Sequence, residues 1–180
     1  MQEALGLTLK EEKAARQGKR FKRLGLGGTF DLLHRGHEHV LRLAFQLAEK
    51  VVLGLSTDGL ASGIKKRKIT PYQERRKRLE SFLEREGLTG RAEIVPISSR
   101  LGTAVEDPEM DAVLVSRENL SRASMINEER KRRGLKPVEV VSFEKVLAEN
   151  GRPISGARIR AGEIARRGAV LRKAKAGGGS

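Results

Sequence analysis

The sequence predicts a single α/β domain in which a five-stranded parallel sheet carries helices on both faces. Two observations predict it. Short apolar runs typical of buried strands alternate along the chain with longer segments whose apolar residues recur at helical spacing. The chain has 180 residues, 38% of them hydrophobic, which is enough for one domain with a real core and too little to favour two.

The first predicted unit is a strand, a helix and a second strand. Residues 21–26 alternate apolar and basic side chains and then meet Gly27 and Gly28, which indicates a strand that ends in a tight turn. Apolar residues recur at helical spacing over residues 38–49, and residues 51–55 form a short apolar run suited to a buried strand. Such a unit implies parallel pairing of the strands with a right-handed crossover.

The rest of the chain continues this alternation. A loop rich in glycine and lysine is expected over residues 58–68. Thr70, Pro71 and Gln73 then form a capping-box arrangement that begins a helix, which is expected to end near Glu86. The further expected elements are strands over residues 92–97, 112–115 and 138–141 and helices over residues 119–133 and 155–166. In a Rossmann-like sheet of this kind, ligands bind beyond the carboxyl ends of the strands, where strand order reverses.

Three regions are expected along the chain: a polar N-terminal arm over residues 1–20, the folded domain over residues 21–167 and a flexible tail over residues 168–180. There is no cysteine, which excludes disulfides, thiolate metal sites and cysteine nucleophiles. No apolar run approaches the roughly 18 residues of a membrane span, and the N-terminus lacks the apolar core of a secretory signal. The sequence therefore predicts a cytoplasmic protein with no membrane partner.

The charge of the chain points to anionic partners. Lys and Arg number 37 against 23 acidic residues, which gives a formal net charge of +14. Such an excess attracts nucleotides, phosphorylated metabolites or nucleic acid. Aromatic residues make up only 3% of the chain and tryptophan is absent, so stacking platforms for single strands are scarce. Nucleic acid is therefore the less favoured partner, and the sequence leaves the oligomeric state open.

The most unusual residues follow the first strand. The segment GGTFDLLHRGH, residues 27–37, places two glycines, Thr29, His34 and His37 around one turn. Glycines let the backbone approach a phosphate chain, the threonine hydroxyl adds a donor, and His37 opens a helix whose free N–H groups favour an anion. Two imidazoles there can donate hydrogen bonds as charge builds on a leaving pyrophosphate. For the short motif alone, a glycine turn with surface histidines is the simpler interpretation, but the combination of strand, turn and amphipathic helix favours a phosphate site.

A metal site is the second alternative for this turn. His34, His37 and His39 cluster there, and Asp31 could complete a set of ligands. Zinc usually takes four protein ligands, or three in a catalytic site, and the chain holds no other histidine and no cysteine. We therefore predict no protein-bound metal, and we expect His39 on the helix surface.

Together these motifs resemble a known family. GGTFD…HRGH is similar to the HxGH signature of the nucleotidyltransferase superfamily, and within it the chain resembles the phosphopantetheine adenylyltransferases of the archaeal and eukaryotic type. The resemblance is carried by residues 27–37, the loop with Lys65 and Lys66 that leads into ITPYQER, the segment 116–134 with INEER, and residues 154–160, and it covers roughly residues 22–165. It implies the nucleotidyltransferase fold. It also implies transfer of the adenylyl group of ATP to 4′-phosphopantetheine, which gives dephospho-coenzyme A and pyrophosphate, with Mg²⁺ accompanying ATP.

The resemblance also implies roles for individual residues. Thr29 and His37 would contact the ATP phosphates and stabilise the transition state, with His34 assisting. Phe30 would lie against the nucleotide, and a lysine of the 65–66 pair would reach the acceptor phosphate. The implied catalytic residues are His37, His34, Thr29 and Lys66, and the implied acceptor-binding residues are Thr29, Lys65 and Lys66. The implied ATP-binding residues are Gly28, Thr29, Phe30, His34, His37, Asn127, Arg130, Ile154, Ser155, Gly156, Ala157, Arg158 and Arg160.

Simpler interpretations stand beside some of these roles. Residues 65–68 also fit an exposed basic loop, and Arg130 also fits a solvated helix face. The family pattern at the last helix is close to Ile-Ser-Ser-Thr, whereas Gly156 and Ala157 here lack two hydroxyl groups. Each lost hydrogen bond is worth about 1 kcal/mol, which predicts weaker ATP binding rather than loss of activity.

Two other functions remain open from the sequence. The first is another HxGH enzyme, an FMN adenylyltransferase or a glycerol-phosphate-type cytidylyltransferase. Cytidylyltransferases carry Arg-Thr-x-Gly just before the last helix, and Gly-Arg-Pro at residues 151–153 counts against that branch. The second, from a different class, is an inactive nucleic-acid-binding domain that has kept the fold. Intact Thr29, His34 and His37 argue against it.

Overall fold

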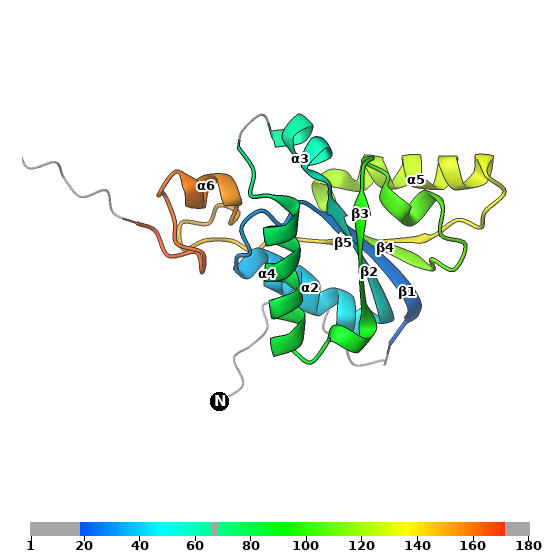
Figure 1. Ribbon diagram of the computed structural model, residues 1–180, viewed down its shortest axis with the longest axis horizontal. Helices are drawn as coiled ribbons and strands as arrows, with labels where there is room; N and C mark the ends of the chain where they lie inside the picture. Colours follow the sequence, from blue (N-terminus) through cyan, green and yellow to red (C-terminus); the bar gives the residue numbers. More distant parts are fainter. Residues whose placement is uncertain (1–18, 66–67, 172–180) are drawn as a thin grey trace, which may run out of the picture.

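Five parallel strands form one sheet in the part of the chain that the structure describes, residues 19–65 and 68–171 of a computed structural model. The strands are β1 (Phe21–Gly28), β2 (Ala48–Ser56), β3 (Ala92–Ile97), β4 (Ala112–Ser116) and β5 (Glu139–Phe143) (Figure 1). The helices are α2 (Arg35–Leu47), α3 (Asp58–Lys65), α4 (Tyr72–Arg85), α5 (Leu120–Arg132) and α6 (Gly156–Arg160), with 3₁₀ turns η1 (Thr89–Arg91), η2 (Gly102–Val105) and η3 (Arg117–Asn119). The fold class predicted from the sequence is confirmed. Of the predicted arm and tail, residues 1–18 and 172–180 lie outside the described part.

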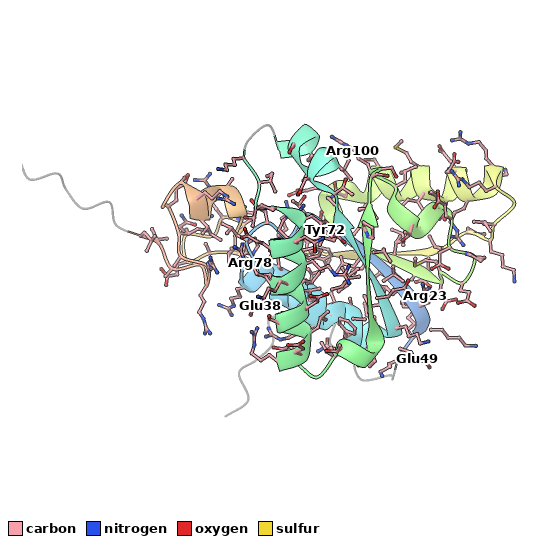
Figure 2. All side chains as sticks on the ribbon, viewed as in Figure 1. Arg23, Glu38, Glu49, Tyr72, Arg78 and Arg100 are labelled. Atoms are coloured by element: carbon pink, nitrogen blue, oxygen red, sulfur yellow. The ribbon has the colours of Figure 1, made fainter. Side chains whose placement is uncertain are left out.

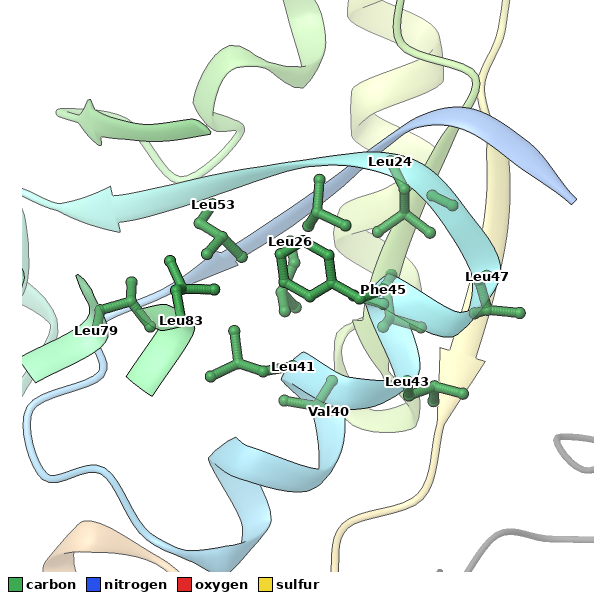
Figure 3. Close-up of a cluster of buried hydrophobic side chains, with 14 of the residues drawn as sticks. Leu24, Leu26, Val40, Leu41, Leu43, Phe45, Leu47, Leu53, Leu79 and Leu83 are labelled. Atoms are coloured by element: carbon green, nitrogen blue, oxygen red, sulfur yellow. The ribbon is translucent and has the colours of Figure 1, made fainter. Parts of the chain in front are cut away.

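Helices cover both faces of the sheet. α2 and α4 pack on one face, and α5 and η2 pack on the other (Figure 1). The alternation of side chains along β1 sorts its residues between the two layers. Leu24 and Leu26 enter the core under α2 and α4 (Figure 3), whereas a side chain at Gly25 would meet Met110 and Val113 of the opposite core. β1 therefore places Leu24 and Leu26 in the core on the α2 and α4 side, whereas Gly25 and Gly27 add no side chain on the other side.

Strand order reverses beside β1. The order is β3-β2-β1-β4-β5, so the chain moves outward from β1 to β3 and then returns to β4 on the other side of β1. β1 pairs with β2 from Phe21 to Gly28 but with β4 only at Leu24 and Gly25. Beyond Gly25 the two strands separate, and their carboxyl ends open the kind of crevice in which α/β proteins bind ligands.

The segment after β2 is a helix, α3, rather than the predicted loop. Thr57 begins it, because its carbonyl accepts from the N–H of Ala61 at 2.9 Å and its hydroxyl accepts from the N–H of Leu60 at 3.4 Å. Ala61 is fully buried. Two glycines in this segment lower its helix propensity and favoured a loop from the sequence, but capping and burial outweigh that preference.

The capping box predicted at the start of α4 is not formed. Pro71 is the N-cap residue rather than the first helical residue, and no side chain caps the helix. The backbone N–H of Thr70 donates instead to Asp31 Oδ1 at 2.9 Å, and the Thr70 carbonyl accepts from Arg75 Nε at 2.7 Å. Contacts with distant segments thus replace the local cap.

The C-terminal helix is shorter than predicted. α6 ends at Arg160 rather than near residue 166, because the chain reverses at Gly162, which has a φ of 67°. Ile164 then pairs with Val170 in an antiparallel bridge, and Ile164 is fully buried. Hydrogen-bonded structure therefore continues beyond residue 167 as far as Leu171.

Candidate active site

A cavity of about 740 Å³ opens at the carboxyl ends of the strands. The turn after β1 and the start of α6 both line it. The predicted site residues in the lining are Gly28, Thr29, Phe30, His34, His37, Ile154, Ser155, Gly156 and Ala157. Two segments more than 100 residues apart in the sequence thus meet in one site. This is the spatial relation that the predicted phosphate site requires.

The turn has an unusual backbone conformation. Phe30 has a φ of 47°, the sole positive value among the described residues other than glycine. The Phe30 ring is buried, and a Cβ on Gly28 would lie 2.7 Å from it, so only glycine fits at position 28. Strain of this kind costs on the order of 1–3 kcal/mol and is concentrated at functional sites. With 2% of its surface exposed, Phe30 supports the turn more than it offers a face for stacking.

His34 caps helix α2. Its Nδ1 accepts from the backbone N–H of His37 at 3.4 Å, so Nδ1 carries no proton and the neutral ring holds its hydrogen on Nε2. Burial lowers the pKa of His34 from 6.5 to about 4, because the charged ring would lose its hydration. At neutral pH His34 is therefore an uncharged donor through Nε2.

His37 stacks on His34, with the two ring centroids 3.8 Å apart. Its Nδ1 lies 2.9 Å from the carbonyl oxygen of Leu32. Since a carbonyl oxygen only accepts, Nδ1 carries a proton, and Nε2 accepts in the neutral ring and donates in the imidazolium. A phosphate oxygen at Nε2 therefore favours the protonated form of His37.

The amides at the start of α2 are mostly occupied, which corrects the expectation of free N–H groups there. The N–H of Arg35 donates to the Arg166 carbonyl at 3.1 Å. The N–H groups of His37 and Glu38 donate to the His34 carbonyl at 2.8 and 3.1 Å. At this helix the imidazoles of His34 and His37 line the cavity in which an anion would bind.

The start of α6 keeps its amides for a ligand. Ser155 caps the helix, and its hydroxyl accepts from the N–H of Arg158 at 3.3 Å. The first N–H groups of a helix have no partner within it, so those of Gly156 and Ala157, which line the cavity, can bind an anion. The absence of hydroxyls at these two positions leaves the backbone donors in place.

Two arginines of α4 donate to backbone carbonyls of the turn after β1. Arg75 is fully buried, donates to the Thr29 carbonyl at 2.9 Å and pairs with Asp58 at 2.8 Å. Arg78, which Figure 2 shows on α4, donates to the Asp31 carbonyl at 3.3 Å. Sequence reasoning missed Arg75, and the available signal was its position on the apolar face of the helix. The two side chains fix the backbone of the turn.

Asp31 in the turn is buried and paired with Arg160. The Arg160 Nη2 lies 2.9 and 2.8 Å from the two carboxylate oxygens of Asp31, and Nε lies 3.3 Å from Oδ2. The resemblance assigns Arg160 to the ATP phosphates, whereas in the structure its guanidinium is held by Asp31.

Three other predicted ATP-binding residues lie outside the cavity lining. Asn127 donates to the Val138 carbonyl and accepts from its N–H. Arg130 is completely buried and donates to three backbone carbonyls, so it does not lie on a solvated helix face. Arg158 is 8% exposed and binds the carbonyls of residues 152 and 153. In the structure all three side chains hold backbone segments in place, and their contact with ATP stays a prediction.

The predicted acceptor lysines lie at the edge of the described chain. Lys65 is the last residue of α3, and Lys66 lies outside the described residues. The cavity lining adds two cations that sequence reasoning missed, Arg100 and Lys145 (Arg100 is labelled in Figure 2). No motif surrounds either residue. The available signal was that each follows a strand, β3 or β5, at the carboxyl edge of the sheet.

The floor of the cavity lacks side chains where two strands meet. Gly27 of β1 pairs with Gly54 of β2, and both line the cavity. A Cβ on Gly27 would meet nothing nearer than 3.8 Å. Gly27 therefore leaves open space on the α5 face of the sheet, whereas a Cβ on Gly54 would lie 3.2 Å from the Ile97 side chain. The apolar residues that surround this space are Val52, Ile97, Met110, Val113 and Ile126.

The described residues show no protein-based metal centre. Within residues 19–65 and 68–171, no group of three His, Cys, Asp or Glu side chains is placed to hold a metal ion. None of the helices described there has both the length and the apolar character needed to cross a membrane.

The fold and the histidine turn define a nucleotidyltransferase, and residues 26–162 match the cytidylyltransferase-like family. A phosphopantetheine adenylyltransferase of Methanopyrus kandleri is 43% identical over 145 residues, which cover 81% of this chain and 92% of that one. The phosphopantetheine adenylyltransferase of Pyrococcus horikoshii is 38% identical over 150 residues, with the same coverage of 81% and 92%. The chain belongs to the phosphopantetheine adenylyltransferase family.

Solved structures at lower identity share the fold. A protein of unknown function from Archaeoglobus fulgidus superposes with a TM-score of 0.62 at 23% identity, covering 74% of this chain and 99% of that one. A lipopolysaccharide core biosynthesis protein from Thermoplasma volcanium gives a TM-score of 0.57 at 21% identity, covering 69% and 98%. At these identities the likeness supports the fold class alone.

Proposed function

We propose that the protein transfers the adenylyl group of ATP to 4′-phosphopantetheine and releases pyrophosphate and dephospho-coenzyme A. One observation carries the proposal: the stacked pair His34 and His37 and the start of α6 line the same cavity at the reversal of strand order. Membership of the family agrees with it. The formal net charge of +14 suits two substrates that are both anionic.

The chemistry requires positioning and charge stabilisation more than proton transfer. An oxygen of the acceptor phosphate attacks the α-phosphorus of ATP, the bond from that phosphorus to the bridging oxygen breaks, and the electron pair leaves with pyrophosphate. A phosphate monoester is already nucleophilic at neutral pH, so no general base is needed. Donors aimed at the leaving oxygens therefore supply most of the catalysis.

The two histidines suit this task in different ways. His34 is held neutral by burial and offers Nε2–H without the cost of hiding a charge. His37 has its Nδ1 proton committed to Leu32, so it donates from Nε2 only as an imidazolium. We propose that the negative phosphates draw the proton onto His37, which adds a positive charge as the pyrophosphate leaves. Thr29 would supply a hydroxyl donor beside them.

The triphosphate is proposed to lie against the start of α6. Ser155, Gly156 and Ala157 line the cavity there, and the last two present backbone N–H groups. Mg²⁺ would enter with ATP, held by phosphate oxygens and water, because no three-residue protein ligand set exists among the described residues. Lys65 and Lys66 remain proposed contacts of the acceptor phosphate.

The glycine floor is proposed to receive the pantetheine arm. This arm is a long, uncharged chain, and the space over Gly27 is open and walled by apolar side chains. Such a pocket admits an extended chain. The floor is therefore proposed to hold the arm of phosphopantetheine, and the acceptor panel tests this against FMN. The cytoplasm is the proposed location.

A panel of acceptors tests the proposal. Purified protein would be given ATP or CTP with Mg²⁺ and one acceptor from phosphopantetheine, FMN, nicotinamide mononucleotide and glycerol 3-phosphate, and pyrophosphate release would be followed. We expect rapid release with ATP and phosphopantetheine, and none after Mg²⁺ is chelated. Faster turnover with FMN, or with CTP and glycerol 3-phosphate, would replace the proposal with that enzyme. No release with any pair, together with nucleic-acid binding that weakens steeply with salt, would identify an inactive binding domain.

A further inference from the structure

A buried carboxylate lies where the proposed function needs negative charge to be absent. Asp31 belongs to the turn after β1 and lines the cavity, and 6% of its side chain is exposed. An unpaired carboxylate there would repel a triphosphate, and the low dielectric around a buried group would strengthen that repulsion. The turn therefore needs a cation on Asp31 before it can bind a nucleotide.

Arg160 supplies such a cation. Its Nη2 lies 2.9 Å from Asp31 Oδ1 and its Nε lies 3.3 Å from Oδ2, so two donors meet the two carboxylate oxygens in the forked arrangement that strengthens arginine–carboxylate pairs. The Arg160 side chain is 38% exposed and stands at the end of α6, outside the cavity lining. The positive charge of Arg160 thus reaches Asp31 from outside the cavity lining.

Asp31 also fixes the start of α4. Its Oδ1 accepts from the backbone N–H of Thr70 at 2.9 Å, and Thr70 lies four residues after Lys66 in the sequence. One carboxylate therefore joins three segments: the histidine turn, the segment that leads from the proposed acceptor lysines into α4, and the helix proposed to bind the triphosphate.

We propose that Asp31 and Arg160 form a positioning pair, in which Arg160 acts on the nucleotide through Asp31 rather than by gripping a phosphate. The pair cancels the charge of the carboxylate and holds the two phosphate-binding segments at a fixed separation. This inference rests on the proposed use of ATP. It reassigns Arg160 from a ligand of ATP to the partner of Asp31.

The two roles for Arg160 predict opposite results in a double-mutant cycle. The variants are Asp31→Asn, Arg160→Gln and the double variant, and MgATP affinity is measured by isothermal titration calorimetry. If Arg160 neutralises Asp31, Arg160→Gln leaves the buried carboxylate without its arginine partner and weakens ATP binding roughly tenfold or more. Asp31→Asn keeps ATP affinity within about threefold of wild type, and the double variant recovers most of the affinity lost in Arg160→Gln.

If Arg160 binds a phosphate directly, removing Asp31 brings no recovery, and the double variant is at least as weak as Arg160→Gln. That result overturns the inference while leaving the proposed function intact. A wild-type protein that binds no MgATP overturns both. Recovery in the double variant supports the inference, because a loss of fold in either single variant would add rather than cancel.

Kinetics and a matched control complete the test. We expect Asp31→Asn to lower kcat for pyrophosphate release by roughly tenfold or more with little change in KM for ATP, because loosened segments misplace bound substrates. Arg160→Lys keeps the charge and should retain more ATP affinity than Arg160→Gln. Arg167→Gln removes the same charge from an exposed residue seven positions further along and should bind ATP as wild type does. Thermal unfolding midpoints of every variant identify any that fail to fold.

Discussion

The buried histidine at the start of α2 predicts a loss of stability in mild acid. Burial lowers the pKa of His34 from 6.5 to about 4 in the folded protein, whereas in the unfolded chain the ring titrates near 6.5. Since protonation then favours the unfolded state, the contribution of His34 is fully present above about pH 6.5 and is lost as the pH falls from 6.5 towards 4. The expected sign is lower stability in acid.

The magnitude follows from the two pKa values. A difference of about 2.5 between 6.5 and about 4 corresponds to about 3 kcal/mol when fully expressed, at about 1.4 kcal/mol per pH unit. Between pH 8 and pH 5 only part of this is lost, about 2 kcal/mol. A single domain has roughly 5–15 kcal/mol of stability, so the loss is easily measured.

The variant His34→Asn isolates the effect. Asparagine is a good N-cap residue, so it keeps an acceptor for the His37 N–H while removing the titrating ring. The free energy of unfolding would be measured by urea titration at pH 8, 7, 6 and 5 for wild type and variant. We expect the wild type to lose about 2 kcal/mol more than the variant between pH 8 and pH 5. A difference between the two proteins that stays constant within about 0.5 kcal/mol across this range would refute the reasoning.

Three further predictions concern the site and its supports. Replacing His37 with Ala should lower kcat at least about 100-fold with a much smaller effect on ATP affinity. Steady-state kinetics and calorimetry measure the two quantities, and His39→Ala on the same helix is the control. Near-normal turnover of the His37 variant would contradict the role given to the ring. Arg130→Met should lower the free energy of unfolding, measured by urea titration, by about 3 kcal/mol. The same change at the exposed neighbour, Arg132→Met, should alter it by less than about 0.5 kcal/mol. Equal effects would mean that the buried contacts of Arg130 contribute nothing to stability. Gly27→Val should raise KM for phosphopantetheine roughly tenfold or more and leave ATP affinity unchanged, because the added carbons fill the floor of the cavity. Gly27→Ala adds one carbon and should raise KM less. An unchanged KM for Gly27→Val would mean that the pantetheine arm binds elsewhere.

The sheet and the histidine turn were predictable because their signals are local. Strand β3 falls on the residues predicted for it, 92–97, and the other strands agree to within a few residues, since each is a short apolar run between turn residues. The two glycines and two histidines after β1 likewise stand in one contiguous segment. Their meeting with α6 followed from topology, because parallel strands present their carboxyl ends at one edge.

Most of what the sequence did not predict comes from contacts between distant segments, and the early end of α6 comes from a local chain reversal. The charged residues around Arg130 predict a solvated side chain. In the structure the side chain is completely buried and donates to the carbonyls of Ala104 and Asp107, more than 20 residues away. Asp31 and Arg160 are separated by 129 positions, so no spacing rule joins them. Helix α6 is short because Gly162 reverses the chain. From the sequence alone, this glycine could equally have been one that a longer helix tolerates in its interior.

The hydrogen bond from the Arg35 amide to the Arg166 carbonyl carries a mechanical consequence. This hydrogen bond joins the first turn of α2 to the segment in which Ile164 and Val170 form an antiparallel bridge. The same segment is bonded to Glu149, whose side chain accepts from the N–H of Val170 at 2.9 Å. Loss of the bridge between Ile164 and Val170 should therefore loosen the start of α2, where His34 and His37 lie, while the strands keep their pairing.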